Sequence, residues 1–189
     1  MTDDSNATLR ASALAARRAL AATERHSHSA TITRAFLRSA HFYKARNIAC
    51  YLSADDEVDT AAVFERAWRT RKRIFAPVIL PRHALAFVEV TPNTRLTKNR
   101  FGIWQPSGDA QIETRKLDVC IAPTVAFDDA GHRIGMGGGY YDRAFAYQKN
   151  SASLKRPRLL GLAFECQKVE EIRPNPWDIP LYRVFTERD

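Results

Sequence analysis

The chain is short of the residues that build disulfide-rich and zinc-binding proteins. Only three of its 189 residues are cysteine, and Cys50, Cys120 and Cys166 lie far apart, with no C-x-x-C spacing. An odd number of isolated cysteines argues against both a zinc site and a disulfide framework. Cys50 and Cys120 lie within apolar, strand-like runs, where a buried thiol is the usual outcome. We therefore expect a protein of a reducing compartment, the cytoplasm.

Long hydrophobic runs are absent as well. No stretch approaches the roughly 20 apolar residues that span a bilayer, so we expect no membrane segment. The first residues include Asp3 and Asp4 and continue rich in alanine and arginine, without the apolar core of a signal peptide. An organellar transit peptide can also be rich in arginine and serine. It is the weaker alternative, because a helical pattern begins almost at once.

Acidic residues are outnumbered, 21 against 29 basic ones, which gives a formal net charge of +8. Such a balance can indicate binding to nucleic acid. The basic residues are dispersed, however, and aromatic residues are not interleaved with them as in a stacking platform. A positive field also steers anionic small substrates toward an enzyme. Charge alone does not choose between these interpretations, and we expect no specific nucleic-acid partner.

Glycine is scarce, but half of the eight glycines lie within five positions, Gly135, Gly137, Gly138 and Gly139. They follow a strand-like apolar run and precede a helix-like segment that starts at residue 140. Glycine lets backbone N–H groups approach a ligand closely, and a helix N-terminus favours negative charge. The loop lacks the endings of a P-loop and of a G-x-G-x-x-G motif, so a plain turn is an alternative.

The residues on either side of this loop favour a nucleotide site. Arg133 can pair with phosphate oxygens through its planar, permanently charged guanidinium group. Asp142 lies where its carboxylate could hold a Mg²⁺ ion that bridges those phosphates. A plain turn would need neither side chain.

At this point the sequence resembles a known family. The segment 123–143, PTVAFDDAGHRIGMGGGYYDR, resembles the signature of 5-formyltetrahydrofolate cyclo-ligases, also called 5,10-methenyltetrahydrofolate synthetases. Three further stretches match in the same order: YLSADDEVDT at 51–60, FGIWQP at 101–106, and Cys166-Gln167 followed by WDIPL at 177–181. The long signature is highly specific, whereas the other three add weight through their order. The resemblance covers most of the chain from about residue 9.

The resemblance implies an ATP- and Mg²⁺-dependent ligase of one-carbon metabolism that forms a C–N bond. ATP would phosphorylate the formyl oxygen of 5-formyltetrahydrofolate, which carries a polyglutamate tail in some forms. The folate N10 would then attack the formyl carbon, and 5,10-methenyltetrahydrofolate, ADP and phosphate would form. In such a scheme the protein mainly positions two anionic ligands and neutralises developing charge.

The same resemblance assigns roles around the nucleotide. The backbone of residues 135–139, Met136 included, would cradle the ATP phosphates together with Arg133 and Tyr140. Arg10 matches the family's N-terminal arginine that reaches over the nucleotide; without the family it would be interpreted as a surface charge. Asp142 would bind Mg²⁺, with Asp178 as a second carboxylate. By itself, Asp178 is typical of a turn.

Other residues would bind the folate. Glu57 matches the acidic residue that accepts hydrogen bonds from the pterin, although a first-turn acid beside a helix dipole is the alternative. Phe101 and Trp104 could stack on the pterin or aminobenzoyl ring, or anchor their loop in the core. Tyr140 and Tyr141 would place hydroxyl groups beside the reaction centre, and at least one of them could simply pack. No residue stands out as a general base.

Two positions depart from the family pattern. Some members carry a lysine at the position of Gly138, where it helps to bind phosphate, and an N-terminal lysine four residues before Arg10, where this chain has Asn6. Another cation must therefore compensate. Arg17 and Arg18, farther along the first helix, are expected to form a solvated basic face.

Strands alternating with helices predict a single α/β domain over residues 1–189, with a mainly parallel sheet and helices on both faces. The resemblance adds a three-layer α/β/α fold like that of sugar-phosphate isomerases and CoA transferases. We expect a monomer, with about residues 1–8 disordered and an exposed basic loop at 150–157. Pro77 predicts an edge strand or an early strand end. Helices are predicted at about 9–20, 29–40, 60–70, 140–147 and near 169, and strands at 47–52, 73–78, 85–90, 117–122 and 159–164.

Three other functions stay open on the sequence. The chain could be a folate- or nucleotide-binding regulator without turnover, but such a regulator has little use for a metal-binding carboxylate beside a phosphate. It could be an RNA-associated protein that exploits the positive charge. It could also be an ATP-dependent enzyme for a different formylated or carboxylated anion, which would keep the phosphate loop without needing Glu57 and Phe101.

Overall fold

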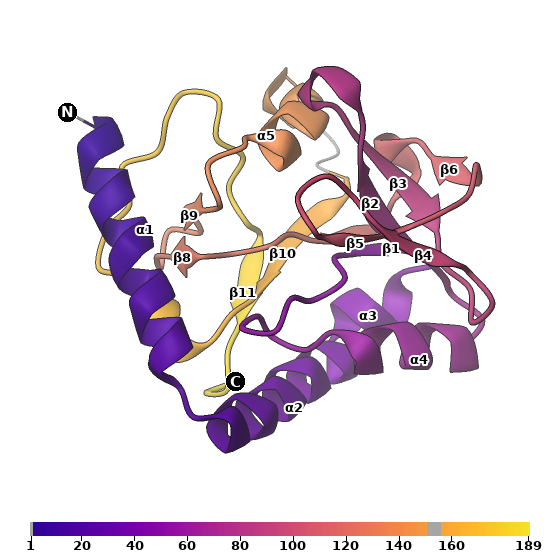
Figure 1. The fold of residues 1–189 in the computed structure, drawn as a ribbon, viewed down its shortest axis with the longest axis horizontal. Coiled ribbons are helices and arrows are strands. Elements are labelled where there is room, and N and C mark those ends of the chain that lie inside the picture. The colour runs from indigo at the N-terminus through magenta and orange to yellow at the C-terminus, as the bar shows by residue number, and fades with distance from the viewer. Residues whose placement is uncertain (1, 151–155) are drawn as a thin grey trace.

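A seven-stranded mixed sheet forms the centre of the molecule (Figure 1). The structure is a computed structural model and describes residues 2–150 and 156–189. Five neighbouring strands, from β11 to β2, run parallel, and β3 and β6 add antiparallel pairs at one edge. In sheet order the strands are β11 (Arg183–Phe185), β10 (Arg158–Leu162), β7 (Val119–Ile121), β1 (Asn47–Cys50), β2 (Arg73–Ile79), β3 (Leu85–Glu89) and β6 (Gln111–Ile112).

Among the described residues, five α-helices and two short hairpins surround the sheet. One hairpin precedes the sheet's last antiparallel strand, and the other leads into the glycine loop. The helices are α1 (Thr2–Ala19), α2 (Ala22–Arg38), α3 (Ala40–Lys44), α4 (Ala61–Arg69) and α5 (Tyr140–Ala144). The hairpins pair β4 (Leu96–Lys98) with β5 (Trp104–Pro106), and β8 (Ala126–Phe127) with β9 (Arg133–Ile134).

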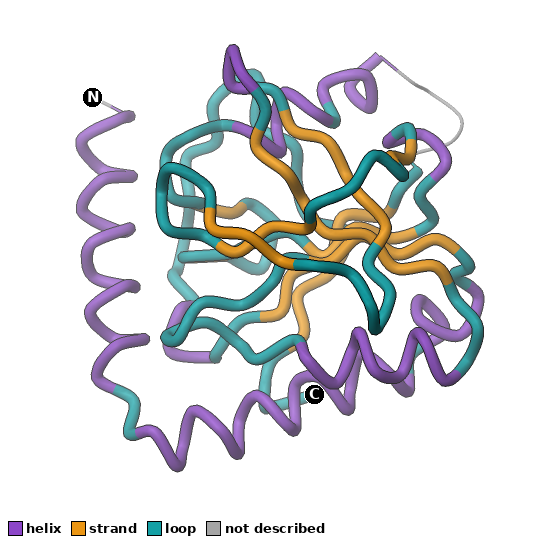
Figure 2. Tube along the Cα trace, turned by 45° about the vertical axis from the view of Figure 1, so that its right-hand side comes forward, coloured by secondary structure: helices purple, strands orange, loops and turns teal. Residues whose placement is uncertain are grey.

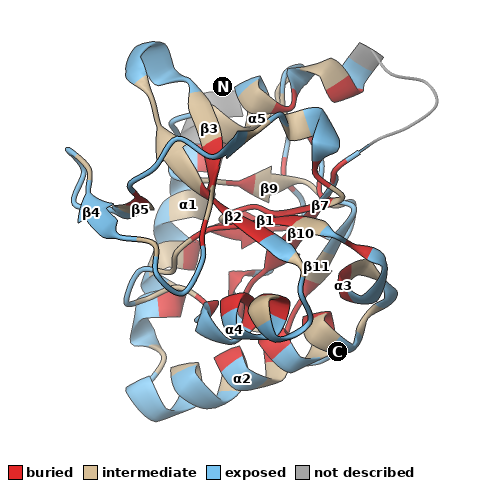
Figure 3. Cartoon of the chain, turned by 90° about the vertical axis from the view of Figure 1, so that its right-hand side faces the viewer, coloured by how far each residue is buried: buried red, intermediate tan, exposed pale blue. Residues whose placement is uncertain are grey.

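Side-chain alternation along the strands builds two cores, one on each face of the sheet. In β1, Ile48 and Cys50 join the core under α2, α3 and α4, whereas Ala49 joins the core on the opposite face. Strands covered on both faces show near-continuous apolar runs, as β1 does. The buried residues in Figure 3 accordingly concentrate in the central strands. The predicted α/β fold with a mainly parallel sheet, covered on both faces, is therefore confirmed.

The second face has a thinner cover than the first. Phe145, just after α5, is fully buried there, together with Ile179 and Leu181 from the C-terminal segment. The predicted helix at 140–147 is only five residues long as an α-helix and continues as a 3₁₀ helix over Ala146–Asn150. A helix this short has only a small dipole and adds little to the attraction of an anion at its N-terminus. The backbone N–H groups of the glycine loop are the remaining local donors for an anion.

Pro77 lies within a central strand, which corrects the prediction of an edge strand. β2 pairs with β1 only from Arg73 to Phe75, and Pro77 lies beyond that overlap, opposite Phe87 of β3. The missing N–H of proline therefore interrupts no ladder with β1. The sequence shows the proline but not how far the neighbouring strand extends.

The first helix stands apart from the α2–α4 layer and packs on the β8–β9 hairpin. Ala13 is buried in a third small cluster with Ala126, Ile134 and Ile172. Figure 2 shows that α1 and α2 run at a steep angle to each other along two sides of the molecule. Asn6 is buried, and its Nδ2 donates to the Arg173 carbonyl. Residues 2–8 are helical in the structure. The disorder that the sequence predicts for them in solution stays a prediction.

Smaller differences concern lengths and omissions. α2 begins seven residues earlier than predicted, the short helix near residue 169 lies at Glu165–Gln167, and β11 was not predicted. Residues 151–155 of the predicted basic loop lie outside the described residues. In the described part of the chain, no helix has the length and apolar character that crossing a membrane requires.

Candidate functional site

The glycine loop connects β9 to α5 and keeps its backbone exposed. Gly137 has φ +91° and Gly139, at the N-terminus of α5, has φ +61°; L-residues with side chains rarely adopt either value. Met136 at the centre of the loop is largely exposed. The loop therefore keeps main-chain groups accessible to solvent, and the predicted binding of phosphates by these groups stays a prediction.

Arg10 reaches this loop from α1. Its Nε donates to the Gly135 carbonyl at 2.8 Å, and its guanidinium lies 3.8 Å from where a Cβ on Gly137 would be. The interpretation of Arg10 as a plain surface charge is thus disfavoured. An arginine 125 residues away in the chain closes one side of the glycine loop.

The ring of Tyr140 fills the space beside Gly138. A Cβ at position 138 would come within 2.6 Å of Tyr140 Cε2, so a side chain there requires the ring to move. Arg143 lies at 5.3 Å over the same ring and donates to the Gly138 carbonyl at 2.6 Å. Arg143 was not among the residues predicted for the site. The only indication in the sequence is that a basic residue lies three positions after Tyr140.

Arg133 and Asp142 form an ion pair at the base of the loop. Both terminal nitrogens of Arg133 donate to Asp142 Oδ1 at 3.2 Å, and the Ile179 amide donates to the same oxygen at 3.1 Å. The Arg133 side chain is only 5% exposed, and its Nε has no hydrogen-bond partner among the described residues. The structure thus brings together the two residues that flank the glycines, as a buried pair beneath the loop.

Tyr141 lies on the same buried side. The Arg133 guanidinium is 6.0 Å from its ring centroid, and within the described residues its hydroxyl is buried with no hydrogen-bond partner. Burial raises the pKa of this phenol, and the charge of Glu57 acts in the same direction. Tyr141 therefore keeps its proton at neutral pH and holds an unused donor near the carboxyl end of β1.

Asp178 adopts the geometry of a turn residue. Its Oδ2 accepts from the Asn175 amide at 2.7 Å, while the next residue, Ile179, donates to Asp142. Asp178 therefore immediately precedes, in the sequence, the residue whose amide contacts Asp142. Across the described ranges, no group of three acidic, histidine or cysteine side chains could hold a metal ion unaided.

Glu57 lies in a turn between β1 and α4. Its Oε2 accepts from the Ala54 amide at 3.0 Å, and its own amide donates to the Ala54 carbonyl. Burial raises the pKa of this carboxyl, partly offset by the Ala54 hydrogen bond and the charge of Arg17. Because α4 begins only at Ala61, Glu57 is not in its first turn, which disfavours the helix-dipole alternative.

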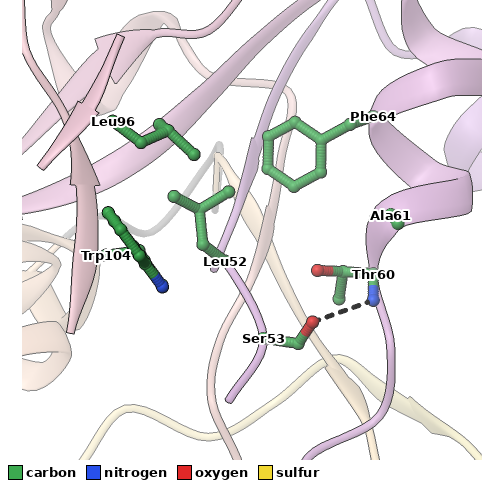
Figure 4. Close-up of a pocket in the computed structure, with 7 residues that line it drawn as sticks. All are labelled: Leu52, Ser53, Thr60, Ala61, Phe64, Leu96 and Trp104. Carbon is green, nitrogen blue, oxygen red and sulfur yellow. Dashed lines mark hydrogen bonds between the residues drawn. The ribbon is translucent and has the colours of Figure 1, made fainter. Parts of the chain in front are cut away.

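A pocket of about 340 Å³ opens between this loop and the β4–β5 hairpin (Figure 4). Trp104 is 50% exposed and lines it, whereas Phe101, equally exposed, lies in the hairpin turn outside the lining. The sequence analysis missed the other lining residues, although two of them directly follow a parallel strand, where such sheets bind ligands. They are Leu52, Ser53, Thr60, Ala61, Phe64 and Leu96.

The burial of Arg17 differs from what the sequence predicts. It was predicted to be solvated, but its side chain is 5% exposed and its Nη2 donates to Asp56 Oδ2 at 2.8 Å. Arg18 is exposed, as expected, and reaches the same oxygen at 3.3 Å. A one-residue step along a helix turns the side chain by about 100°, which separates a buried from an exposed position.

Comparisons with known proteins point to one family. The model of the 5-formyltetrahydrofolate cyclo-ligase family matches residues 2–187. The 5-formyltetrahydrofolate cyclo-ligase of Haemophilus influenzae is 36% identical over 88% of this chain and 89% of its own length, and that of Escherichia coli K12 is 40% identical over 75% and 78%.

The solved structures agree as well. The NMR structure of Aquifex aeolicus 5,10-methenyltetrahydrofolate synthetase has a TM-score of 0.82 and 28% identity, and the match covers 97% of this chain and 90% of that one. The family match, the relatives and the shared fold lead to one conclusion: this chain belongs to the 5-formyltetrahydrofolate cyclo-ligase family.

Proposed function

We propose that this protein converts 5-formyltetrahydrofolate to 5,10-methenyltetrahydrofolate and, in the same reaction, converts ATP to ADP and phosphate. Family membership supports the reaction. The observation that carries the proposal is the glycine loop, clasped by Arg10 and lying directly over the Arg133–Asp142 pair. Such a loop exposes N–H donors beside a fixed positive charge and a carboxylate, which suits a magnesium nucleotide.

The chemistry requires activation of a poor electrophile. The nitrogen that carries the formyl group donates electrons into the carbonyl, so the formyl carbon is a poor electrophile, and its oxygen is a poor leaving group until it is phosphorylated. Transfer of the ATP γ-phosphoryl group to that oxygen turns it into phosphate. Attack of N10 on the formyl carbon then forms the new C–N bond, and the C–O bond breaks as phosphate leaves.

On the nucleotide side, the backbone of residues 135–139 would bind the phosphates, with Arg10 closing the loop from α1. Arg133 would stabilise negative charge as the phosphoryl group moves. Its buried Nε and the Tyr141 hydroxyl are polar groups without partners among the described residues, which a bound ligand or water could satisfy. Tyr140, at the edge of the loop, would contact both substrates.

The carboxylates fit Mg²⁺ rather than a metal held by protein alone. Mg²⁺ is usually bound by one or two carboxylates together with substrate phosphates and waters. Asp142, and Asp178 in the segment whose next residue, Ile179, donates to Asp142, would supply that number. When bound, Mg²⁺ would neutralise phosphate charge, and Arg133 would hold the Asp142 carboxylate in its orientation.

On the folate side, Glu57 would accept the N–H donors of the pterin edge, and Trp104 and Phe101 would supply aromatic faces. A half-buried carboxylate that already receives an amide hydrogen bond is well placed to accept from a ligand. We further propose that the enzyme acts as a cytoplasmic monomer and accepts polyglutamylated folates.

The test follows the absorbance of the methenyl product from 5-formyltetrahydrofolate, ATP and Mg²⁺. We expect product only when ATP and Mg²⁺ are both present, and a loss of at least about a hundredfold in kcat for Asp142→Asn. Asparagine keeps the size of the side chain, so the variant should fold; Asp142→Ala removes the acceptor of three donors and serves as a harsher comparison. No product from folded wild-type protein would refute the proposal and favour a regulator or a different formylated substrate.

A further inference from the structure

One face of α1 contacts both halves of the proposed site. Arg10 and Arg17 are seven residues apart, which places them on the same helix face about 10 Å apart along the axis. Arg10 donates to Gly135 of the glycine loop, and Arg17 donates to Asp56, next to Glu57. The same rigid element therefore contacts the proposed nucleotide loop and the proposed folate loop.

Arg17 is bound far more tightly into the structure than its neighbour. The Arg17 side chain is 5% exposed, against 66% for Arg18, although both contact Asp56 Oδ2. Within the described chain, the Arg17 Nε has no hydrogen-bond partner. Burial of a permanently charged group is costly unless it is paired, so the Asp56 contact is its main compensation.

The partner of Arg17 belongs to a turn with three consecutive acids, Asp55, Asp56 and Glu57. The turn is short, because the Glu57 amide and the Glu57 carboxylate both return to Ala54. Like charges this close repel one another, and a buried cation on one side offsets that repulsion. The hydrogen bond and the charge of Arg17, with a smaller contribution from Arg18, also hold the pKa of Asp56 below its usual value in spite of burial.

We propose that Arg17 is a positioning residue: through Asp56 it holds the turn that carries Glu57 at a fixed place relative to the glycine loop. Arg17 would touch neither substrate, and α1 would act as a brace between the two binding loops. The role of Glu57 in this inference rests on the proposed function. That Arg17 holds the turn rests only on the contacts described above.

The kinetic test compares Arg17→Met with Arg17→Lys and with Arg18→Met as a matched control. For Arg17→Met we expect the KM for 5-formyltetrahydrofolate to rise at least about tenfold, while the KM for ATP and kcat change less than about threefold. Arg17→Lys should restore the folate KM to within about threefold of wild type, because lysine can still pair with Asp56. An unchanged folate KM in Arg17→Met, or an equal rise in Arg18→Met, would overturn the proposal.

A double-mutant cycle tests the path through Asp56. Asp56→Asn should raise the folate KM in the same way, and adding it to Arg17→Met should raise the KM no further, since both changes break one contact. Fully additive effects would show that Arg17 acts by another route and would refute the role of Asp56.

Hydrogen exchange gives a readout that needs no activity. In substrate-free protein, peptides covering residues 52–59 should exchange faster in Arg17→Met than in wild type or Arg18→Met. Unchanged exchange in a folded Arg17→Met variant would overturn the inference even if the enzyme is active. Faster exchange in a protein whose wild type forms no methenyl product would support the brace and refute the proposed reaction instead. If Arg17→Met does not fold, Arg17→Lys, expected intermediate in exchange and in folate KM, serves the same comparison.

Discussion

Gln167 and Asp128 are buried polar side chains that hold loops in place near the site. Gln167 Nε2 donates to the carbonyls of Thr124 and Val125, and its Oε1 accepts from the Phe164 amide. Asp128 accepts from the Ile172 amide and from His132. Buried polar groups with full sets of partners specify one arrangement of the backbone. Within the Cys166-Gln167 match, Gln167 therefore has a structural role, because it links the segments around Thr124 and Phe164.

Replacing Asp128 should destabilise the hairpin that leads to the glycine loop. Burial alone would raise the pKa of Asp128, but the hydrogen bonds from Ile172 and His132 outweigh it and lower the pKa below 3.8. The folded state thus favours the ionised carboxylate. Its contribution to stability is complete above about pH 4 and is lost as pH falls through the folded-state pKa. For Asp128→Ala we expect a loss of roughly 1–3 kcal/mol at neutral pH.

Urea denaturation at several pH values measures this loss. The difference between wild type and Asp128→Ala should shrink as the pH drops toward 3. Asp129→Ala is the matched control: Asp129 is exposed, its ion pair among the described residues is with Lys168, and exposed pairs contribute little to stability. Equal losses in the two variants would contradict the assignment.

Glu57→Gln tests the folate-binding role at the residue scale. Glutamine keeps the size but replaces one acceptor oxygen with a donor, which would face the N–H donors of the pterin. We expect the KM for 5-formyltetrahydrofolate to rise by about tenfold to a hundredfold, because an unmatched polar contact costs roughly 1–3 kcal/mol. The KM for ATP should stay within about twofold. Steady-state kinetics with each substrate varied in turn would show it, and Asp55→Asn, in the same turn, is the control.

At the scale of elements, the β4–β5 hairpin separates the two aromatic residues that the sequence analysis treated alike. Trp104 faces the pocket, and Lys98 lies 5.0 Å from its ring, whereas Phe101 lies in the turn with Arg100 over its ring. Sequence spacing placed both in one glycine-containing loop. Only the strand pairing of Lys98 with Trp104 determines which ring lies over the pocket.

The hairpin geometry predicts unequal effects of removing the two rings. Trp104→Ala should raise the folate KM at least about fivefold more than Phe101→Ala, since the tryptophan ring supplies a wall of the pocket. Ile103→Ala, an exposed neighbour on the same hairpin, controls for loosening of the hairpin. Steady-state measurement of the KM for 5-formyltetrahydrofolate in the three variants tests this prediction. A larger effect at Phe101 would mean that the hairpin closes over the ligand in a way that this structure does not contain.

For the whole molecule, the question is what its positive charge does. A second hollow, at the amino edge of the sheet, is lined by basic residues, yet two of them are engaged internally. Lys72 donates to the carbonyls of Tyr43 and Ala45, and Arg73 pairs with Glu89. Internal pairing of these two residues reduces the free positive charge of this hollow. This pairing fits general steering of anions better than recognition of a nucleic acid.

Steering predicts that kcat/KM falls as salt rises. Both substrates are anions and the chain carries +8, so kcat/KM for 5-formyltetrahydrofolate should drop by roughly threefold to tenfold between about 50 and 300 mM KCl. Free Mg²⁺ must be held constant throughout. If kcat/KM does not change with salt concentration, electrostatic steering of the substrates is refuted. Tight RNA binding that keeps its base preference at high salt would instead favour a nucleic-acid partner.

The sequence by itself determined the features that depend on local chemistry. The glycines and their charged neighbours predicted the loop over Arg133 and Asp142, and apolar runs predicted the central strands, because backbone freedom, side-chain charge and strand periodicity are properties of short segments. The family resemblance, carried by such segments, was confirmed as well.

The tertiary structure decided what depends on distant parts of the chain meeting. It buried Arg17 against Asp56, brought Arg10 to Gly135, placed Pro77 past the end of a neighbouring strand, and set Trp104 rather than Phe101 over the pocket. Each of these outcomes is fixed by which element packs against which. Burial and ion pairing depend on those contacts, and a pattern within one segment does not contain them.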